Sequence, residues 1–159
     1  MVDVRPATVD DIGELVRLRG LLFASLGESF GPPPDGPAHR DWRSACAAAL
    51  AEQLADDRTR VLVVDGGERL ACCGVGVIDQ RLPTPYNPGG RVGHVFGVVT
   101  DPAYRRRGYA RAVVTGLLRW FDDRGLWRVD LNAAPNAQAL YRSLGFDDPP
   151  DPLLSRRRA

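Results

Sequence analysis

Residues 91–111 read RVGHVFGVVTDPAYRRRGYAR and join an expected strand to an expected helix. The first ten are mainly β-branched, aromatic or Gly, which predicts a strand over Arg91–Thr100. Asp101-Pro102 then turns the chain away. An amphipathic helix is expected from Gly108 to about Arg124, because its apolar residues recur at helical spacing. Its buried stripe should comprise Ala110, Val113, Val114, Leu117, Leu118 and Phe121.

The turn between these two elements has the features of a phosphate site. The N-terminus of a helix presents unpaired amides and a partial positive charge, and both favour an anion. Gly108 allows a phosphate to approach the backbone closely, and Arg105–Arg107 add charge, so a pyrophosphate suits this turn. Neither G-x-G-x-x-G nor a Gly-Lys-Ser/Thr motif is present, which excludes the common dinucleotide and nucleotide loops. On charge alone, three solvated arginines remain the alternative.

On the N-terminal side, residues 2–5 are expected to form a short strand. Thr8 and Asp11 have the spacing of a capping box, and the apolar stripe after them predicts a helix that ends near Gly27. The segment 27–41 is rich in Gly and Pro and is expected to be an extended loop. A second, Ala-rich helix should run from Trp42 to about Asp56.

The rest of the chain supplies a hairpin and a final strand and helix. Strands are expected at 60–65 and 70–78, joined by the turn Asp65-Gly66-Gly67-Glu68, with an irregular loop at 81–91. Residues 127–132 should form a fifth strand. A helix capped by Asn136 should run to Leu144 and stop at Gly145. This order predicts an α/β fold with a mixed sheet.

Composition narrows the class of protein. A chain of 159 residues with 44% hydrophobic and 26% charged residues fits one soluble domain, 1–159. No segment has the length of a membrane span and no signal peptide is evident, so a cytoplasmic protein without membrane contact is expected. The net charge of +1 argues against nucleic acid as a partner. Cys46, Cys72 and Cys73 lack metal-ligand spacing, so no metal is expected.

Two motifs resemble the GNAT superfamily of N-acetyltransferases. Residues 101–110 resemble the family's R/Q-x-x-G-x-G/A turn, including the strand before it and the helix after it. Residues 136–146, NAQALYRSLGF, look like a second family signature, with Leu140-Tyr141 and Gly145-Phe146. The resemblance implies a three-layer fold in which helices flank a central mixed, mostly antiparallel sheet. It also implies transfer of the acetyl group of acetyl-CoA to a primary amine by direct attack on the thioester.

By this resemblance, the pyrophosphate of acetyl-CoA binds the amides of residues 106–111. The pantetheine arm pairs like an added strand with the end of the strand at Val98–Thr100, and such pairing needs only main-chain groups. The full set expected to bind the cosubstrate is Val98, Val99, Thr100, Arg105, Arg106, Arg107, Gly108, Tyr109, Ala110, Arg111 and Asn136.

Two side chains are candidates for proton transfer. The resemblance makes Tyr141 the general acid that protonates the leaving thiolate, and a buried core aromatic is the alternative. His94 is expected on the same strand face as Phe96 and Val98, where its imidazole could accept the proton of the amine. A hydrogen-bonded strand histidine without a chemical role is equally compatible. Asp130 and Asn132 are fallback polar groups, and ordered water is another candidate base.

The acceptor is open at this stage: a small molecule, a peptide or a protein could supply the amine. Loops 27–41 and 81–91 are expected to line its pocket. The chain is short and proline-rich after Phe146, so a single strand near Leu153-Leu154 is expected in place of a final hairpin. A non-catalytic acyl-CoA-binding sensor is the alternative function. The sequence is also compatible with a homodimer.

Overall fold

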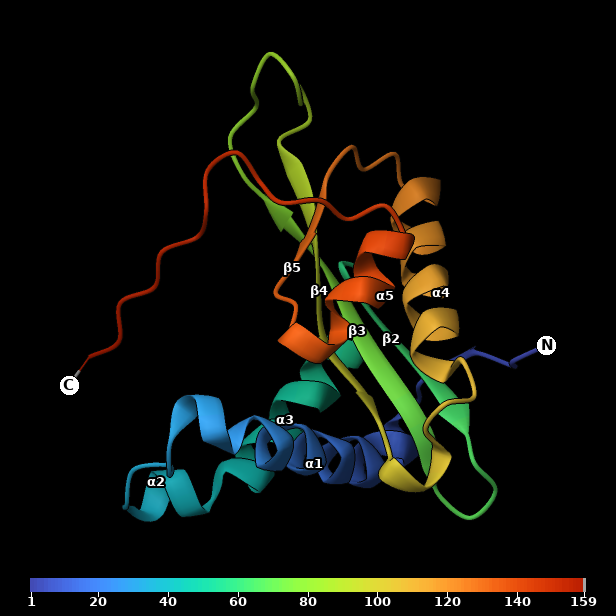
Figure 1. The fold of residues 1–159 in the computed structure, drawn as a ribbon, viewed down its shortest axis with the longest axis vertical. Coiled ribbons are helices and arrows are strands. Elements are labelled where there is room, and N and C mark those ends of the chain that lie inside the picture. The colour runs from blue at the N-terminus through green and yellow to red at the C-terminus, as the bar shows by residue number, and fades with distance from the viewer. Residues whose placement is uncertain (159) are drawn as a thin grey trace.

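A five-stranded sheet forms the middle layer of the computed structural model, which describes residues 1–158 (Figure 1). The strands lie side by side in chain order and pair antiparallel, except that β4 and β5 are parallel. They are β1 (Arg5–Pro6), β2 (Thr59–Asp65), β3 (Leu70–Gln80), β4 (Arg91–Thr100) and β5 (Val129–Leu131). The expected α/β class and mixed, mostly antiparallel sheet are confirmed.

Helices cover both faces of this sheet. On one face lie α1 (Ile12–Phe30) and α3 (Trp42–Leu54), with the single turn α2 (Pro37–Arg40) between them in the chain. On the other face lies α4 (Tyr109–Asp123), with the short α5 (Gln138–Ser143) beside it (Figure 1). Three 3₁₀ turns complete the fold: η1 (Val9–Asp11), η2 (Pro102–Tyr104) and η3 (Pro135–Ala137). None of the helices in residues 1–158 is long and apolar enough to cross a membrane.

The sheet separates two hydrophobic cores. Alternation along the strands sends one set of side chains to α4 and the other to α1 and α3. Cys72 belongs to the α4 core and its neighbour Cys73 to the α1 core, so the expectation that they point to opposite faces is confirmed. On the α4 side, the Phe121 ring lies so close to the sheet that a Cβ on Gly93 would come within 2.8 Å of it. Gly93 therefore permits this contact.

Several expected boundaries were wrong. Helix α1 continues through Gly27 and ends only at Phe30, with Gly31 as its C-cap, because an internal glycine weakens a helix by about 1 kcal/mol but does not stop it. The expected loop 27–41 thus contains the end of α1 and all of α2. In α4, Trp120 belongs to the buried stripe, whereas Leu118 is only half-buried.

The C-terminal part also departs from expectation. Helix α5 begins at Gln138 and not at Asn136, which lies exposed in η3 without a capping hydrogen bond. Its end is as expected: Gly145 has a left-handed φ of 95°, and the Phe146 amide donates to the Tyr141 carbonyl at 3.1 Å. The strand expected near Leu153-Leu154 is not found, and these two side chains are exposed.

Candidate active site

A bulge in β4 shapes the centre of the sheet. Val99 lies opposite Cys73 and Phe96 opposite Val75, so three steps along β4 match two along β3. The extra residue is accommodated at Gly97, whose φ of 63° lies in the left-handed region.

The bulge corrects one expectation about faces. Beyond Gly97 the alternation is reversed, so Phe96 packs in the α1 core while Val98 packs in the α4 core. His94 stacks on Phe96 with ring centroids 6.0 Å apart and therefore shares its face, but Val98 lies on the opposite one.

The same region of β4 has an open edge. Strand β5 pairs with β4 only between Gly93–Val95 and Val129–Leu131. Within the described residues, the segment 97–100 has β3 on one side and no strand on the other. Its main-chain groups can therefore pair with an extended ligand, as in strand addition.

The turn that follows β4 presents free amides to solvent. Arg106 has a φ of 63° and Gly108 one of 76°, so the backbone twice enters the left-handed region before α4 begins. Within the described residues, no backbone amide from 105 to 111 donates to a main-chain or side-chain acceptor, and the first such bond runs from Ala112 to the Gly108 carbonyl. Arg105, Arg106 and Arg107 are exposed. Amides and positive charge thus converge at the N-terminus of α4.

Asp101 holds this turn to the body of the protein. Its carboxylate accepts from the Ala103 amide at 2.9 Å and from Arg17 of α1 at 2.7 Å. These two donors, the amide foremost, lower the pKa of Asp101 below its usual range. Arg111 in the first turn of α4 donates to Ser143 of α5 at 2.8 Å, so the turn, α4 and α5 are mechanically connected.

Tyr141 lies on the α4 side of the sheet. The residue is 8% exposed, and its ring meets that of Phe146 edge-on at 6.0 Å. Burial, and then the neighbouring Cys72 thiol, raise the pKa of the Tyr141 phenol. Cys72 also accepts a hydrogen bond from Thr100 at the end of β4, at 3.4 Å. Its hydroxyl is protonated at physiological pH.

His94 lies on the other face, beside the wall that Phe96 forms. The residue is half-buried, faces Val77 on β3 and Asp130 on β5 across the sheet, and has no hydrogen bond among the described residues. Asp130 is held by Arg128 at 2.9 Å. His94 and Tyr141 therefore lie on opposite faces of the sheet, and His94 belongs to the part of β4 that pairs with β5.

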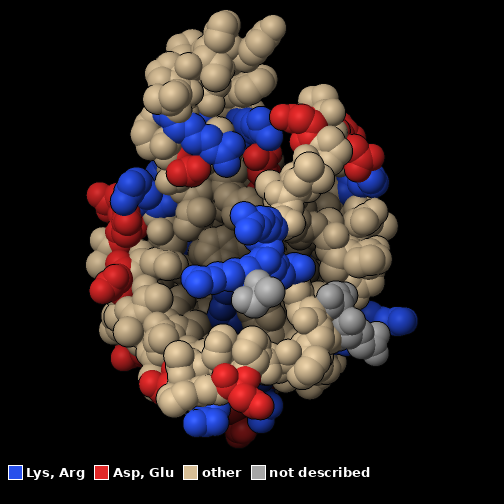
Figure 2. Space-filling model, turned by 90° about the vertical axis from the view of Figure 1, so that its left-hand side faces the viewer, with Lys and Arg blue, Asp and Glu red and all other residues tan. Residues whose placement is uncertain are grey.

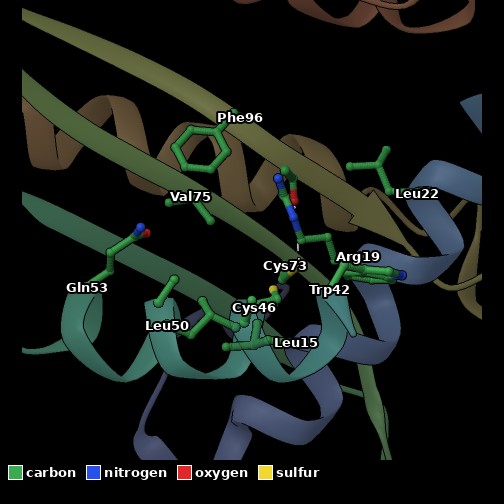
Figure 3. Close-up of a pocket in the computed structure, with 13 residues that line it drawn as sticks. Leu15, Arg19, Leu22, Trp42, Cys46, Leu50, Gln53, Cys73, Val75 and Phe96 are labelled. Atoms are coloured by element: carbon green, nitrogen blue, oxygen red, sulfur yellow. Dashed lines mark hydrogen bonds between the residues drawn. The ribbon is translucent and has the colours of Figure 1, made fainter. Parts of the chain in front are cut away.

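A cavity of about 390 Å³ lies between α1, α3 and the sheet (Figure 3). Its wall includes Phe96 and Gly97, so it ends at the bulge. Among the described residues, α1, α3, β3 and β4 supply its lining, whereas loops 27–41 and 81–91, which are expected to line the acceptor pocket, supply none of it. The lining residues are Leu15, Arg19, Leu22, Trp42, Ala45, Cys46, Ala49, Leu50, Gln53, Cys73, Val75, Phe96 and Gly97.

Two features of the sequence are found in the lining of this cavity. The stripe Trp42, Cys46, Ala49 and Leu50 has the spacing of a core-facing helix, yet part of it faces the empty space. Arg19 occupies an apolar position of α1, four residues after Leu15 and three before Leu22. A charged residue within an apolar stripe suggests a polar role in an apolar site. Among residues 1–158, no group of three or more His, Cys, Asp or Glu is placed to hold a metal ion.

Known proteins are similar to this chain both in sequence and in fold. The family described as Acetyltransferase (GNAT) family matches residues 21–146. Glucosamine 6-phosphate N-acetyltransferase 1 of Oryza sativa subsp. japonica is 32% identical over 145 residues, which cover 84% of this chain and 82% of that protein.

Two solved structures show the same fold. A predicted acetyltransferase from Clostridium acetobutylicum, crystallised with acetyl-CoA, superposes with a TM-score of 0.82 at 20% identity, covering 98% of this chain and 96% of that one. A GCN5-related N-acetyltransferase from Ralstonia eutropha JMP134 gives a TM-score of 0.81 at 22% identity, covering 99% of both chains.

Proposed function

We propose that this chain, which belongs to the acetyltransferase (GNAT) family and uses acetyl-CoA to acetylate a primary amine, binds the cosubstrate along the open edge of β4 and receives the amine in the cavity. One observation carries the proposal. A turn of unpaired amides directly follows an unpaired strand edge, and residues of the bulge in the same strand line the cavity. The sites proposed for the pyrophosphate, for the pantetheine arm and for the amine thus adjoin one another.

The turn fits the pyrophosphate of acetyl-CoA. The amides of residues 106–111 are available, and a Cβ on Gly108 would have nothing within 4 Å, so the backbone is open to a ligand. Arg105–Arg107 supply charge without blocking the amides. Asn136, exposed in η3, is proposed to make a polar contact with the cosubstrate.

The edge of β4 suits the pantetheine arm. Val98, Val99 and Thr100 follow the bulge on the segment that β5 leaves unpaired. An arm paired there would bring the thioester to the bulge, between the face of Tyr141 and the face of His94.

The reaction forms one bond and breaks one. The amine nitrogen attacks the thioester carbonyl carbon, the N–C bond forms and the C–S bond breaks, which leaves an N-acetylated amine and a thiolate. Tyr141, protonated because burial raises its pKa, donates a hydrogen bond and then a proton to that thiolate. The amine must lose one proton, and His94, directly or through water, accepts it.

Glucosamine 6-phosphate is the acceptor that the name of the rice relative supplies, and it is the first amine to test. The test is a screen of amine classes with acetyl-CoA, in which release of free thiol is followed. Turnover with any amine supports the proposal. Binding of acetyl-CoA without turnover for any amine would instead identify the non-catalytic sensor.

A further inference from the structure

The lining of the cavity is uneven in polarity. Arg19 is its one charged side chain and Gln53 its one side-chain amide, whereas the larger residues of the wall are apolar. Glu14 and Asp101 form ion pairs with Arg17, two residues before Arg19 in α1. Within the described residues, Arg19 has no carboxylate partner and only the Phe23 ring lies under it, at 5.2 Å.

From this geometry we propose that the acceptor is an apolar α-amino acid, whose carboxylate binds Arg19 and whose side chain fills the cavity. The proposal rests on the proposed function and names its substrate class. An arginine in an apolar, partly enclosed site binds a carboxylate more strongly than it would in water, because fewer water molecules compete for both groups. The product is the N-acetyl amino acid, and the thiol of CoA is released.

The position of Arg19 sets the distance between the carboxylate and the amine of the acceptor. A Cβ built on Gly97 would lie 3.5 Å from Nη1 of Arg19, so the guanidinium touches the bulge (Figure 3). The thioester is proposed at this same bulge. A carboxylate on Arg19 and an amine at the thioester must therefore lie within a few bonds of each other, as they do when both are attached to one carbon.

The walls of the cavity select the rest of the acceptor. Leu15, Leu22, Trp42, Leu50 and Phe96 surround the space in Figure 3 with apolar surface. An aliphatic or aromatic side chain gains from burial there. Beyond Arg19 and Gln53, the side chains of this wall offer the hydroxyls of a sugar few hydrogen-bond partners, and unpaired buried polar groups are costly. The cavity therefore disfavours an amino sugar.

Basic side chains also gather on one face of the molecule. Figure 2 shows basic side chains gathered near the centre of one face, beside a hollow. Arg157 of the C-terminal segment lies over the Phe30 ring, at the end of α1, at 5.2 Å. Such charge raises the local concentration of anionic ligands and speeds their arrival.

The test compares acceptors and variants. L-Phenylalanine, phenylethylamine, which lacks only the carboxylate, and glucosamine 6-phosphate are assayed with acetyl-CoA for wild type, Arg19→Met, Arg19→Lys and Arg43→Met. Arg43 is the matched control, since it stacks on Trp42 from α3 and does not line the cavity.

For Arg19→Met, kcat/KM with phenylalanine should fall about 10- to 100-fold, while the value with phenylethylamine stays within about twofold. Arg19→Lys should keep part of the activity, and Arg43→Met all of it.

Comparing each variant with wild type on the same amine removes differences in amine pKa. Equal losses on both amines would show that Arg19 is structural and would overturn the inference. Faster turnover of glucosamine 6-phosphate than of every apolar amino acid would also overturn it, while leaving the proposed acetyl transfer intact. Absence of turnover with all amines would overturn both.

Discussion

Tyr141 and His94 lie on opposite faces of the sheet, and this separation allows each to be tested alone. Tyr141 is buried beside Phe146 and Cys72, whereas His94 stacks on Phe96 next to the cavity. A change in one should not disturb the packing of the other.

Tyr141→Phe retains the ring and its edge contact with Phe146 but removes the hydroxyl. If Tyr141 protonates the thiolate, kcat should fall about 10²-fold. The dissociation constant of acetyl-CoA should barely change, because the ring packing is kept. Steady-state kinetics and calorimetry measure the two quantities. Wild-type turnover in this variant would mean that water protonates the thiolate and that Tyr141 only packs.

His94→Gln tests the base. If the imidazole accepts the proton, the pH profile of kcat/KM in wild type should contain a limb that His94→Gln abolishes. The Gln variant should also lose about 10²-fold in turnover, with acetyl-CoA binding unchanged.

The control is His39→Gln, which changes the other histidine, an exposed residue of α2. An acceptor with a lower amine pKa would shift only the part of the profile that belongs to the substrate. An identical profile in His94→Gln would assign the proton to water or to Asp130.

At the scale of elements, the junction of β4 and α4 combines the unpaired edge of a strand with unpaired backbone amides. Gly108→Asp should weaken acetyl-CoA binding at least about tenfold, because its charge would face the pyrophosphate. Gly108→Asn is the matched control, since Asn is nearly the same size, tolerates a left-handed φ and is neutral. No atom lies within 4 Å of the added Cβ, so both variants should fold. Equal affinities of the two variants, measured by calorimetry, would remove the pyrophosphate from this turn.

At the scale of the whole molecule, an ion-pair network joins three distant parts of the chain. Glu14 and Arg17 of α1 bind each other, Glu14 accepts from the Leu70 amide at the start of β3, and Arg17 binds Asp101 after β4. The network fixes the helix that carries Arg19 relative to the turn that follows the bulged strand. Its loss should therefore affect stability as well as the site.

Asp101→Asn should lower the free energy of unfolding by about 1–3 kcal/mol at pH 7, since it removes the charge from a buried carboxylate that binds Arg17. The direction in which the free energy of unfolding changes with pH follows from the lowered pKa of Asp101. The stabilisation is complete above the unfolded pKa, about 3.9, and is lost as pH falls through the lower folded pKa. Wild type and variant should thus converge in acid, as urea titrations at several pH values would show.

The exposed pair of Asp148 and Arg142, 3.0 Å apart, supplies the control. Asp148→Asn should change stability by no more than about 1 kcal/mol. A constant difference between Asp101→Asn and wild type down to pH 2 would contradict a role for the charge of Asp101.

The sequence by itself determined the α/β class, strand 91–100, the turn at Gly108 and the helix after it, because alternation, helical spacing and turn residues are local patterns. It also placed Tyr141 on a helix and Cys72 and Cys73 on opposite faces. The tertiary structure alone decided the reversal of faces at Gly97, because a bulge depends on how β3 and β4 pair. It alone decided that α1 and α3 stand apart far enough to leave a cavity that ends at the bulge, with Arg19 beside it. Packing between segments distant in the chain sets that space, and no local pattern specifies it.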